Sequence, residues 1–534
     1  MPSTRLLKLC NAACGLMKRL LTLLCGIALW GTSASAQLTE QQQIQKLNYA
    51  YQYIRNNYVD DVPLEPLVEE AIIATLKELD PHSTYLTQEQ MTNLRTRLRG
   101  EFAGIGIRYI MHNDTIVVRS ITPHSPAERA NIRLNDRIIS IDNLSAVGLS
   151  TDSAAMLLRG DADTQLSFSI IRRGEPNKID ISLQRKIIET SAISASMRIG
   201  DVGYIRATSF SKPLASEFLS AYKQLGKIKS LVIDLRDNGG GAITSAIDLS
   251  GLFLRKGDVI VSTEGRTNSV VYDKKRDGEI LDIPIVVIIN ESSASASEIF
   301  AGAIQDHDRG VIIGHTSFGK GLVQRVIDLK DGTGMCLTTT RYKTPSGRTI
   351  QRPYTMGKGE EYMSDSMRFM HPDSIAHDPS LMFTTLKRGR KVYGGGGITP
   401  DVYINTDSIT LSPRLAQLHA QAIFEHTAVE IWDRFSPHTL REQYPTVEEF
   451  NAKYEPSEQI YELFYSAASS TPDDFTEIDH KFIRTMILAT MAEQIYQESA
   501  RQYIYGMNFD YMMQRALNIA TNNSLYTEIL ENAN

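Results

Sequence analysis

Cysteine is scarce in this sequence, and most of it lies in one short segment. Four cysteines occur in 534 residues, and three of them, Cys10, Cys14 and Cys25, precede position 37. A chain that loses that segment keeps only Cys336, so it can form no internal disulfide and offers no cysteine cluster to a metal ion. Its stability must come from buried hydrophobic cores, and we expect neither a metal nor another cofactor.

Long runs of a single charge and low-complexity segments are also absent. Apolar residues make up 42% and charged residues 22% of the chain, which is ordinary for globular protein. The formal net charge of -6 leaves no basic footprint for DNA or RNA, so nucleic acid is excluded as a partner. The chain is too long for one hydrophobic core, and we expect about two to four domains.

Long apolar runs are missing as well. The run at residues 20–30 covers 11 positions, too few to cross a bilayer comfortably. It precedes the small residues at 34–36 and follows a leader whose charged residues are all basic, namely Arg5, Lys8, Lys18 and Arg19. This order is typical of a secretory signal peptide, residues 1–36, cleaved after Ala36. Removing those four basic residues lowers the net charge from -6 to -10.

The signal segment predicts an exported protein. An uncleaved segment would instead leave the protein associated with a membrane. Met1 and Met17 both remain open as the first translated residue, because the leader is long and Met17 alone would start a compact signal.

Residues 37–100 are expected to be helical. Apolar residues recur at three- and four-residue steps over 67–79. The Asp-Pro-His-Ser run at 80–83 ends this helix, because the residue before a proline disfavours the helical conformation. His82 has a side chain that is common in catalysis, but its place next to a proline in a turn favours a structural role.

From residue 101 to 186 the pattern changes to short strands separated by turns. A glycine-containing loop at 102–106 leads into a strand, a Ser-Pro-Ala run at 125–127 opens a short helix, and a turn at Asn135 precedes an alternating strand. A helix at 153–158 and a strand at 166–172 follow. In this order the features resemble a PDZ domain. Such domains usually have glycine where Asn135 stands, but asparagine also tolerates a positive φ.

A PDZ domain binds the C-terminus of a protein or peptide. The resemblance implies that the bound tail adds a strand to a sheet edge and that backbone N–H groups of a glycine loop hold its carboxylate. The residues that would bind it here are Phe102, Ala103, Gly104, Ile105, Gly106 and Ile107. The expected partners are therefore protein or peptide substrates that are recognised through their C-termini.

Residues 187–409 alternate strands with helices. Short strands rich in β-branched residues are predicted at 202–206, 230–235, 283–289 and 311–313, with helices at 214–225 and 296–305. This alternation favours an α/β core with a buried sheet. The fold class is therefore α/β (α+β) and multidomain, with a PDZ domain inserted between a helical N-terminal region and the core.

Residues 410–534 are again expected to form helices. Aromatic residues such as Phe424, Phe435 and Tyr511 recur along this tail, and we expect them to pack in a core. We find no chemistry in the tail. Contacts with a second copy of the chain or with an adaptor protein through this C-terminal helical domain stay open.

Three short segments of the α/β core can carry chemistry. A serine-rich run at 290–299 follows an apolar strand and opens a helix, whose first N–H groups can stabilise an oxyanion. Lys320 stands between two glycines, where other backbone can approach it closely. The run at 234–241 joins a strand end to a glycine loop that can present N–H donors. Each segment alone is more typical of a helix cap or a turn than of a catalytic site.

Together the three segments resemble the C-terminal processing peptidases, the S41 family of serine peptidases, over about residues 44–405. The resemblance implies that Ser295 is the nucleophile and that Lys320, 25 positions later, is the general base. Gln324 would assist the lysine. The family also implies a periplasmic enzyme, and the helical tail lies outside the resemblance.

The resemblance also implies an oxyanion hole. One of the two glycines Gly240 and Gly241 would supply an N–H group, and Ala296 would supply the other. Gly239 replaces the proline of the family, which loosens the loop but keeps both glycines. The Gly-Lys-Gly run at 319–321 does not fit a phosphate-binding loop, because Leu322 stands where a serine or threonine would bind magnesium.

A lysine can act as a base only when its amine is neutral. An exposed lysine has a pKa of about 10.4 and is charged at neutral pH. Burial among apolar groups disfavours the charged form and lowers the pKa, so a buried lysine can accept the serine proton and later return it to the leaving amine.

Two alternatives remain open at this point. His307, Asp308 and His315 lie near Ser295 in sequence and could complete a Ser–His–Asp site, although the serine lacks the Gly-x-Ser-x-Gly turn. A catalytically inactive PDZ scaffold or ligand carrier could also retain this fold.

Overall fold

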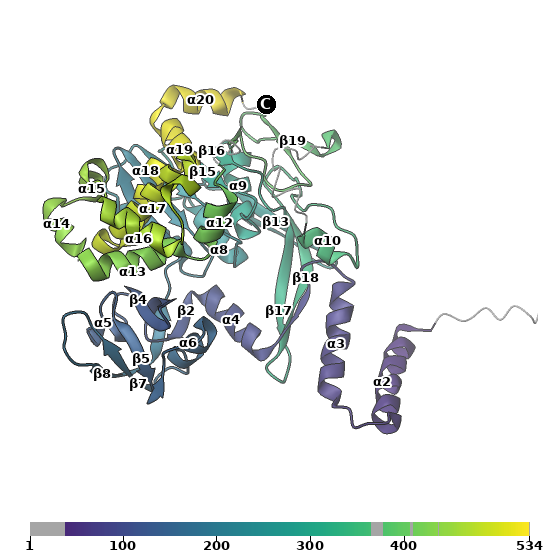
Figure 1. Cartoon of the computed structure of the whole chain (residues 1–534). Helices are drawn as coiled ribbons and strands as arrows, with labels where there is room; N and C mark the ends of the chain where they lie inside the picture. Colours follow the sequence, from purple (N-terminus) through teal and green to yellow (C-terminus); the bar gives the residue numbers. More distant parts are fainter. Residues whose placement is uncertain (1–37, 365–377, 406–409, 436, 533–534) are drawn as a thin grey trace, which may run out of the picture. The chain divides into compact units, whose positions relative to one another are not determined.

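The computed structural model describes residues 38–364, 378–405, 410–435 and 437–532 (Figure 1). The predicted signal peptide at 1–36 lies outside these residues. The chain separates into two compact units, one that reaches to Ala74 and one that begins at Thr75. Among the described residues, no helix combines the length and the apolar character that a membrane span requires.

The first unit consists of helix α2 (Glu40–Asn57) and most of helix α3 (Leu64–Lys77). Thr39 and Gln42 form a capping box that satisfies backbone N–H groups at the start of α2. The Tyr51 hydroxyl of α2 donates to the Leu67 carbonyl of α3 at 3.1 Å. These helices confirm the helical prediction for this part of the chain.

The PDZ region, in the second unit, is built on an antiparallel sheet. Its strand order is β3 (Ile107–His112), β4 (Thr115–Ile121), β5 (Arg137–Ile141), β7 (Gln165–Ile171) and β8 (Ile179–Gln184), with β6 (Leu144–Ser145) beside β5. Ser125 caps the short helix α5 (Pro126–Arg129), and α6 (Thr151–Leu158) is the second helix. Asn135 has a φ of 63°, as its place in the turn predicts.

The glycine loop of this domain is shorter than predicted. Residues Glu101–Gly104 form strand β2, which pairs antiparallel with β9 (Lys186–Glu189). The loop prediction is therefore wrong for Phe102–Gly104, because their partner strand is distant in the sequence and gives no local signal. Ile105 packs in the PDZ core, where only 2% of its surface is exposed.

The α/β core is a sheet in the order β10 (Ile193–Ile199), β11 (Val202–Ala207), β12 (Ser230–Asp234), β15 (Ile285–Ile289), β16 (Val311–Gly314) and β21 (Val402–Tyr403). All neighbours are parallel except β10 and β11. Five residues each of β12 and β15 are buried, as expected for a sheet covered on both faces. The predicted strands and the fold class are confirmed.

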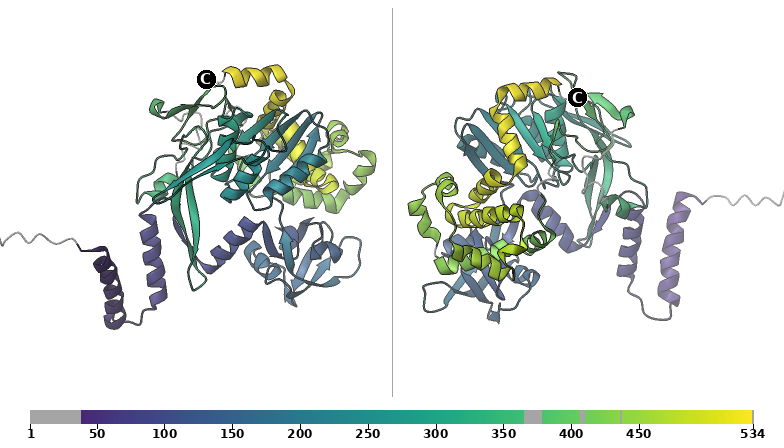
Figure 2. Two further views of the ribbon diagram at one scale, coloured as in Figure 1. Left: turned by 180° about the vertical axis from the view of Figure 1, so that it is seen from behind. Right: turned by 45° about the horizontal axis from the view of Figure 1, so that its top comes forward.

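Helices cover both faces of this sheet. On one face lie α7 (Leu214–Gln224), α8 (Ile243–Gly251) and α9 (Ala296–Asp306), whose Phe218 and Phe300 contact Phe253 between them. On the other face lies the tail helix α19 (Tyr511–Thr521), drawn in yellow in Figure 2. Its Met512 and Met513 pack in one core with Tyr204 and Val286 of the sheet. α20 (Asn523–Asn532) follows α19.

A second sheet stands beside the core. Its path is β1 (Thr84–Leu86), β18 (Gly334–Lys343), β13 (Val259–Gly265) and β14 (Ser269–Asp273), and β17 (Leu322–Asp328) pairs with β18 as a long hairpin. Helix α4 (Gln88–Arg99) links β1 to the PDZ region. Smaller elements are α10 (Gly359–Met363), the 3-10 turn η2 (Pro379–Leu381) and the strand pair β19 (Met382–Thr384) and β20 (Lys391–Tyr393).

The tail is helical, as predicted. It contains α12 (Pro413–Ala420), α13 (Ile423–Phe435), η4 (Pro437–Thr439), α14 (Leu440–Gln443), α15 (Val447–Lys453), α16 (Glu458–Ala467), η5 (Pro472–Asp474), α17 (Glu477–Tyr496) and α18 (Glu498–Asn508). Phe424 lies in a core of its own with Phe450 and Phe464. The core prediction is wrong for Phe435 and Tyr511, which are 38% and 48% exposed because they lie at helix ends.

Candidate active site

Ser295 lies on the sharp turn between strand β15 and helix α9. Its φ of 56° and ψ of -110° are unusual for a residue with a side chain. The turn is fixed from the run at 234–241, because the Ala294 amide and the Ser297 hydroxyl both donate to the Asn238 carbonyl, at 3.0 and 2.7 Å. A strained backbone held by its surroundings in this way is common at functional sites.

Glu298 ties the serine turn to the lysine segment. Its fully buried carboxylate accepts hydrogen bonds from the Ser295 amide at 2.7 Å and the Lys320 amide at 2.9 Å. The Ser317 hydroxyl and the Gly319 amide donate to its other oxygen at 2.6 and 2.7 Å. Burial raises the pKa of Glu298, although these four donors oppose that shift. The sequence motif contains Glu298 but does not indicate this bridging role.

Lys320 and Gln324 meet as the sequence predicts. The Lys320 Nζ donates to Gln324 Oε1 at 2.8 Å. Burial lowers the pKa of the Lys320 amine, and the nearby Cys336, Glu298 and Asp80 partly offset that effect. A lowered pKa increases the neutral fraction of the amine, which is the form that can accept a proton.

The glycine loop lies against the turn that carries Ser295. Gly240 has a φ of 94°, and a Cβ there would lie 2.9 Å from the Ala296 nitrogen and 2.7 Å from the Ala294 oxygen. Only glycine fits such a contact. The Gly240 amide donates to Asn238 Oδ1 at 3.0 Å. Among the described residues, the Gly241 and Ala296 amides have no hydrogen-bond acceptor, so these two N–H groups are available to an oxyanion.

The predicted site residues line one cleft of about 1420 Å³. It holds all six residues predicted for catalysis and the oxyanion hole, namely Ser295, Lys320, Gln324, Gly240, Gly241 and Ala296. Of the predicted peptide-binding residues, Phe102 and Ala103 also line this cleft. Ile107 instead begins β3, the edge strand of the PDZ sheet, which among the described strands pairs only with β4.

The histidines of the alternative Ser–His–Asp site are engaged elsewhere. The His307 Nε2 contacts the Val259 carbonyl at 2.7 Å, and His315 contacts Glu291 and the Ile404 carbonyl at 3.1 and 2.9 Å. Asp308 accepts a hydrogen bond from Arg390 at 2.7 Å. None of the three candidates lines the cleft of Ser295. This part of the described structure gives the Ser–His–Asp alternative no support.

Two further residues line the cleft that the sequence does not predict to be part of the site, although it favours a structural role for His82. The buried Tyr342 hydroxyl lies 2.8 Å from the Lys320 carbonyl and 3.2 Å from the Ser295 carbonyl, so it joins the two segments a second time. His82 also lines the cleft. No local pattern places either residue in the cleft, because both positions depend on segments that meet only in the folded chain.

Comparisons with known proteins show which family this chain belongs to. Three family profiles match the sequence: peptidase family S41 at 201–356, a PDZ domain at 103–183, and the N-terminal domain of the activating protease CtpB at 28–90. A carboxy-terminal-processing protease of Bartonella bacilliformis is 39% identical over 318 residues, which are 58% of this chain and 73% of that protein. The chain belongs to peptidase family S41.

Two further proteins are similar to this chain. The carboxy-terminal processing protease CtpA of Bacillus subtilis is 34% identical over 317 residues, 59% of this chain and 68% of its own. The solved structure of the photosystem II D1 C-terminal processing protease is 25% identical, with a TM-score of 0.35 over 70% of this chain and 95% of that one. The prediction of an S41 peptidase with a PDZ domain is confirmed. The tail from residue 410 lies beyond all three matched profiles.

Proposed function

We propose that this S41 peptidase is an exported serine endopeptidase that uses a Ser295–Lys320 dyad and selects its protein substrates by their C-terminal tails. The observation that carries the dyad is a half-buried lysine amine with a lowered pKa, bound to Gln324, in the same cleft as a strained serine. Two relatives are named carboxy-terminal processing proteases, which supports the choice of substrate.

The reaction begins with a proton transfer between the two dyad residues. The neutral Lys320 amine takes the proton of the Ser295 hydroxyl while the serine oxygen attacks the carbonyl carbon of the peptide bond. The negative oxygen of the tetrahedral intermediate is stabilised by the Gly241 and Ala296 N–H groups. When the C–N bond breaks, the lysine ammonium gives its proton to the leaving amine, and an acyl ester remains on Ser295.

The second half of the reaction repeats these roles with water. The amine, neutral again, takes a proton from a water molecule that attacks the ester, and the ammonium returns that proton to Ser295. Gln324 orients the amine through an uncharged acceptor, so it does not stabilise the ammonium as a carboxylate would.

The PDZ domain would select the substrate. Strand β3 lies at the sheet edge, where an extended peptide tail can pair with it, and the backbone around Gly106 would hold the terminal carboxylate. Phe102 and Ala103 precede this segment and line the cleft, which links the place of recognition to the place of cleavage.

Labelling with a fluorophosphonate tests the nucleophile. We expect the purified mature protein to be labelled and to cleave an unfolded protein, and Ser295→Ala to do neither. Lys320→Ala should lose cleavage with its circular dichroism unchanged. An unlabelled wild-type protein that still binds C-terminal peptides would favour the inactive scaffold instead. N-terminal sequencing of protein from the periplasm would test export, with Gln37 expected as the first residue.

A further inference from the structure

The turn at 80–83, which we call the Asp80 turn, is held by one buried carboxylate. Asp80 Oδ1 accepts hydrogen bonds from the amides of His82 and Ser83, at 2.8 and 2.9 Å. Its Oδ2 accepts from the Ser83 hydroxyl at 2.6 Å. Asp80 is 6% exposed, so these bonds are shielded from water and fix the backbone of the turn.

The Asp80 turn is also attached to strand β18. The Thr338 hydroxyl donates to Asp80 at 3.1 Å, and the Thr338 amide donates to the Ser83 hydroxyl at 3.1 Å. Thr338 is the register partner of Gln324 on the neighbouring strand β17. The turn is therefore fixed to the same hairpin that carries Gln324.

The turn contacts Gln324 directly. The Gln324 Nε2 donates to the His82 main-chain carbonyl, while its Oε1 accepts from the Lys320 Nζ at 2.8 Å. A carbonyl can only accept, so it binds the amide through the nitrogen. The other end of the amide, the oxygen, is then turned toward the amine. The His82 carbonyl therefore determines that Lys320 meets the side-chain oxygen of Gln324 and not its nitrogen.

The side-chain ring of His82 contacts Tyr362. It packs edge-on against Tyr362, with ring centroids 5.2 Å apart, and its Nε2 lies 3.3 Å from the Tyr362 hydroxyl. Burial, and next the charge of Lys320, lower the pKa of His82 to about 4. His82 is therefore neutral at pH 7 and adds no positive charge beside the dyad.

From these contacts we infer that the Asp80 turn is a positioning element for the catalytic base, in which Asp80 and His82 act on Lys320 through Gln324. The inference rests on the proposed role of Lys320. Neither Asp80 nor His82 contacts the reacting atoms in this scheme. The Asp80 turn contributes to the site by fixing the side-chain amide of Gln324 in one orientation.

A double-mutant cycle tests the inference. We would measure kcat/KM on a quenched fluorogenic peptide with a free apolar C-terminus for wild type, Asp80→Ala, Gln324→Ala and the double variant. Each single variant should lose roughly 10- to 100-fold, because a small displacement of a catalytic group is costly. The double variant should lie within about twofold of Gln324→Ala, because the turn then has no amide to hold.

Asp331→Ala is the matched control. Asp331 also holds a turn of the β17–β18 hairpin, accepting from the Thr333 amide and hydroxyl at 3.0 and 2.6 Å, but within the described structure its side chain forms no hydrogen bond with Gln324 or Lys320. We expect kcat/KM to stay within about twofold of wild type.

The pH profile provides a second readout that a purely structural role would not move. The titratable groups that face Lys320 are Cys336 from β18, Glu298 from α9, and Asp80 and His82 from the turn. Asp80→Asn keeps the size of the side chain but removes a negative charge that raises the pKa of Lys320. The acidic limb of kcat/KM should therefore move to lower pH.

The outcomes distinguish the positioning role of the Asp80 turn from the catalytic role of Lys320. If Asp80→Ala fails to fold, the same cycle is made with Asp80→Asn. Additive losses together with an unmoved acidic limb would overturn the positioning role. Full activity in Lys320→Ala would instead overturn the dyad, whatever the cycle shows.

Discussion

The backbone of Ser295 has a strained conformation. Its φ of 56° and ψ of -110° lie where residues with a Cβ are disfavoured, whereas glycine is not. We predict that Ser295→Ala and Ser295→Gly are both inactive and that the glycine variant has the higher free energy of unfolding, by about 1 kcal/mol. Urea denaturation followed by circular dichroism measures the difference.

The control for this comparison is a glycine at an ordinary helical position. Ala215 lies within α7, and Ala215→Gly should lower the free energy of unfolding by about 1 kcal/mol. A Ser295→Gly variant that is no more stable than Ser295→Ala would mean that the turn carries no strain.

The protonation state of Lys320 should set how the reaction rate depends on pH. Because its pKa is lowered by burial, the base is competent above that pKa and is lost below it, so kcat/KM should rise with pH through this value. Gln324→Glu would place a carboxylate beside the amine and favour the ammonium. We expect its acidic limb to move to higher pH by about one unit or more. A pH–rate profile that is flat for both proteins would contradict a titrating lysine.

Residues of the site differ in how far the sequence predicts them. Ser295, Lys320 and Gln324 stand in short motifs, and the cleft brings all three together. The bridging contacts of Glu298 and Tyr342 could not be predicted, because they depend on the distance between segments that only the fold sets. The local φ of Asn135 could be predicted, since a turn before a strand requires it.

The start of the tail helix α19 contacts the run at 234–241, which ends in the glycine loop of the candidate site. Arg236, in the run at 234–241, donates to both oxygens of Asp510 at 2.9 and 2.6 Å and to Asp234. Burial alone would lower the pKa of Arg236, but the two carboxylates raise it well above its usual range. Asp510 also caps α19 by accepting from the Met513 amide. The tail is therefore part of the support of the site.

We predict that Asp510→Ala lowers both stability and activity. It leaves the buried guanidinium with one carboxylate and removes a helix cap, so the free energy of unfolding should fall by about 3–5 kcal/mol. Loosening of the adjacent loop should lower kcat more than it changes KM. Thermal unfolding and steady-state kinetics measure these two effects.

Glu531→Ala is the control for Asp510→Ala. Glu531 forms an ion pair with Arg388 at 3.6 Å from the other end of the tail, but both side chains are largely exposed, at 58% and 40%. Its loss should change the free energy of unfolding by less than about 0.5 kcal/mol. Normal kinetics in Asp510→Ala would show that the loop does not depend on the tail.

Elements were predictable where one local pattern dominates. The buried strands β12 and β15 are runs of apolar residues bounded by turns, and they lie where the sequence predicts them. Strand β2 was missed because its pairing with β9 joins the two ends of the PDZ region. The β17–β18 hairpin gave no clear signal either, because most of its residues are only partly buried.

In the proposed function, the PDZ domain binds the C-terminus of a substrate that is cut in the cleft of Ser295. If the PDZ domain reads a free C-terminus, a peptide with an amidated end should be cut about tenfold or more slowly than the free acid, because it loses charge-assisted hydrogen bonds. A peptide ending in aspartate should also be cut poorly. The comparison uses one peptide series that differs only at the last residue. Equal rates for the acid and the amide would remove tail recognition and leave the dyad untouched.

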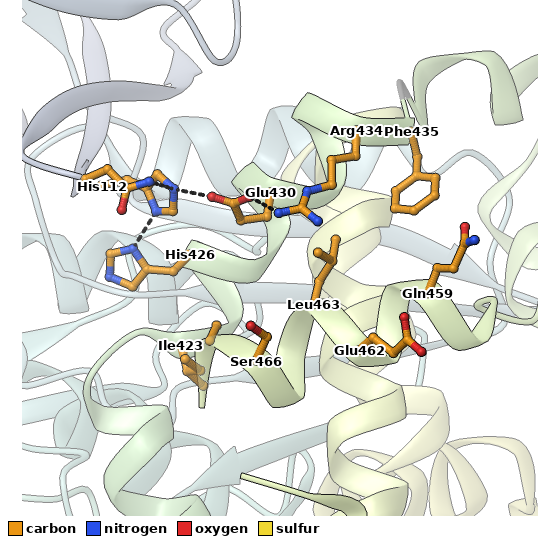
Figure 3. A pocket seen from close by; sticks show the side chains of 12 residues that line it. His112, Ile423, His426, Glu430, Arg434, Phe435, Gln459, Glu462, Leu463 and Ser466 are labelled. Atoms are coloured by element: carbon orange, nitrogen blue, oxygen red, sulfur yellow. Dashed lines mark hydrogen bonds and ion pairs between the residues drawn. The ribbon is translucent and has the colours of Figure 1, made fainter. Parts of the chain in front are cut away.

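The PDZ domain also contacts the tail. His112, at the end of edge strand β3, lies 3.0 Å from His426 and 3.0 Å from Glu430 of helix α13, beside a pocket of about 900 Å³ (Figure 3). Arg137 of β5 forms an ion pair with Asp433 of the same helix at 2.6 Å. These contacts hold the strand that would receive the substrate tail against a region that the matched family profiles do not include.

A charge exchange tests whether the Arg137–Asp433 pair holds this contact. Both side chains are partly buried, at 23% and 32% exposed, so Arg137→Asp alone sets two carboxylates against each other, and Asp433→Arg alone sets two guanidinium groups together. We expect each single variant to increase hydrogen exchange at β3 and α13 by about fivefold, which corresponds to about 1 kcal/mol. The double variant restores an opposite-charge pair and should return exchange toward wild type.

Lys178→Glu is the control, since Lys178 is 60% exposed and pairs with Asp180 within the PDZ region. If both single variants exchange like wild type, the pair does not hold the contact. If the double variant is worse than both, the effect of each change is local disruption and not the loss of their mutual attraction.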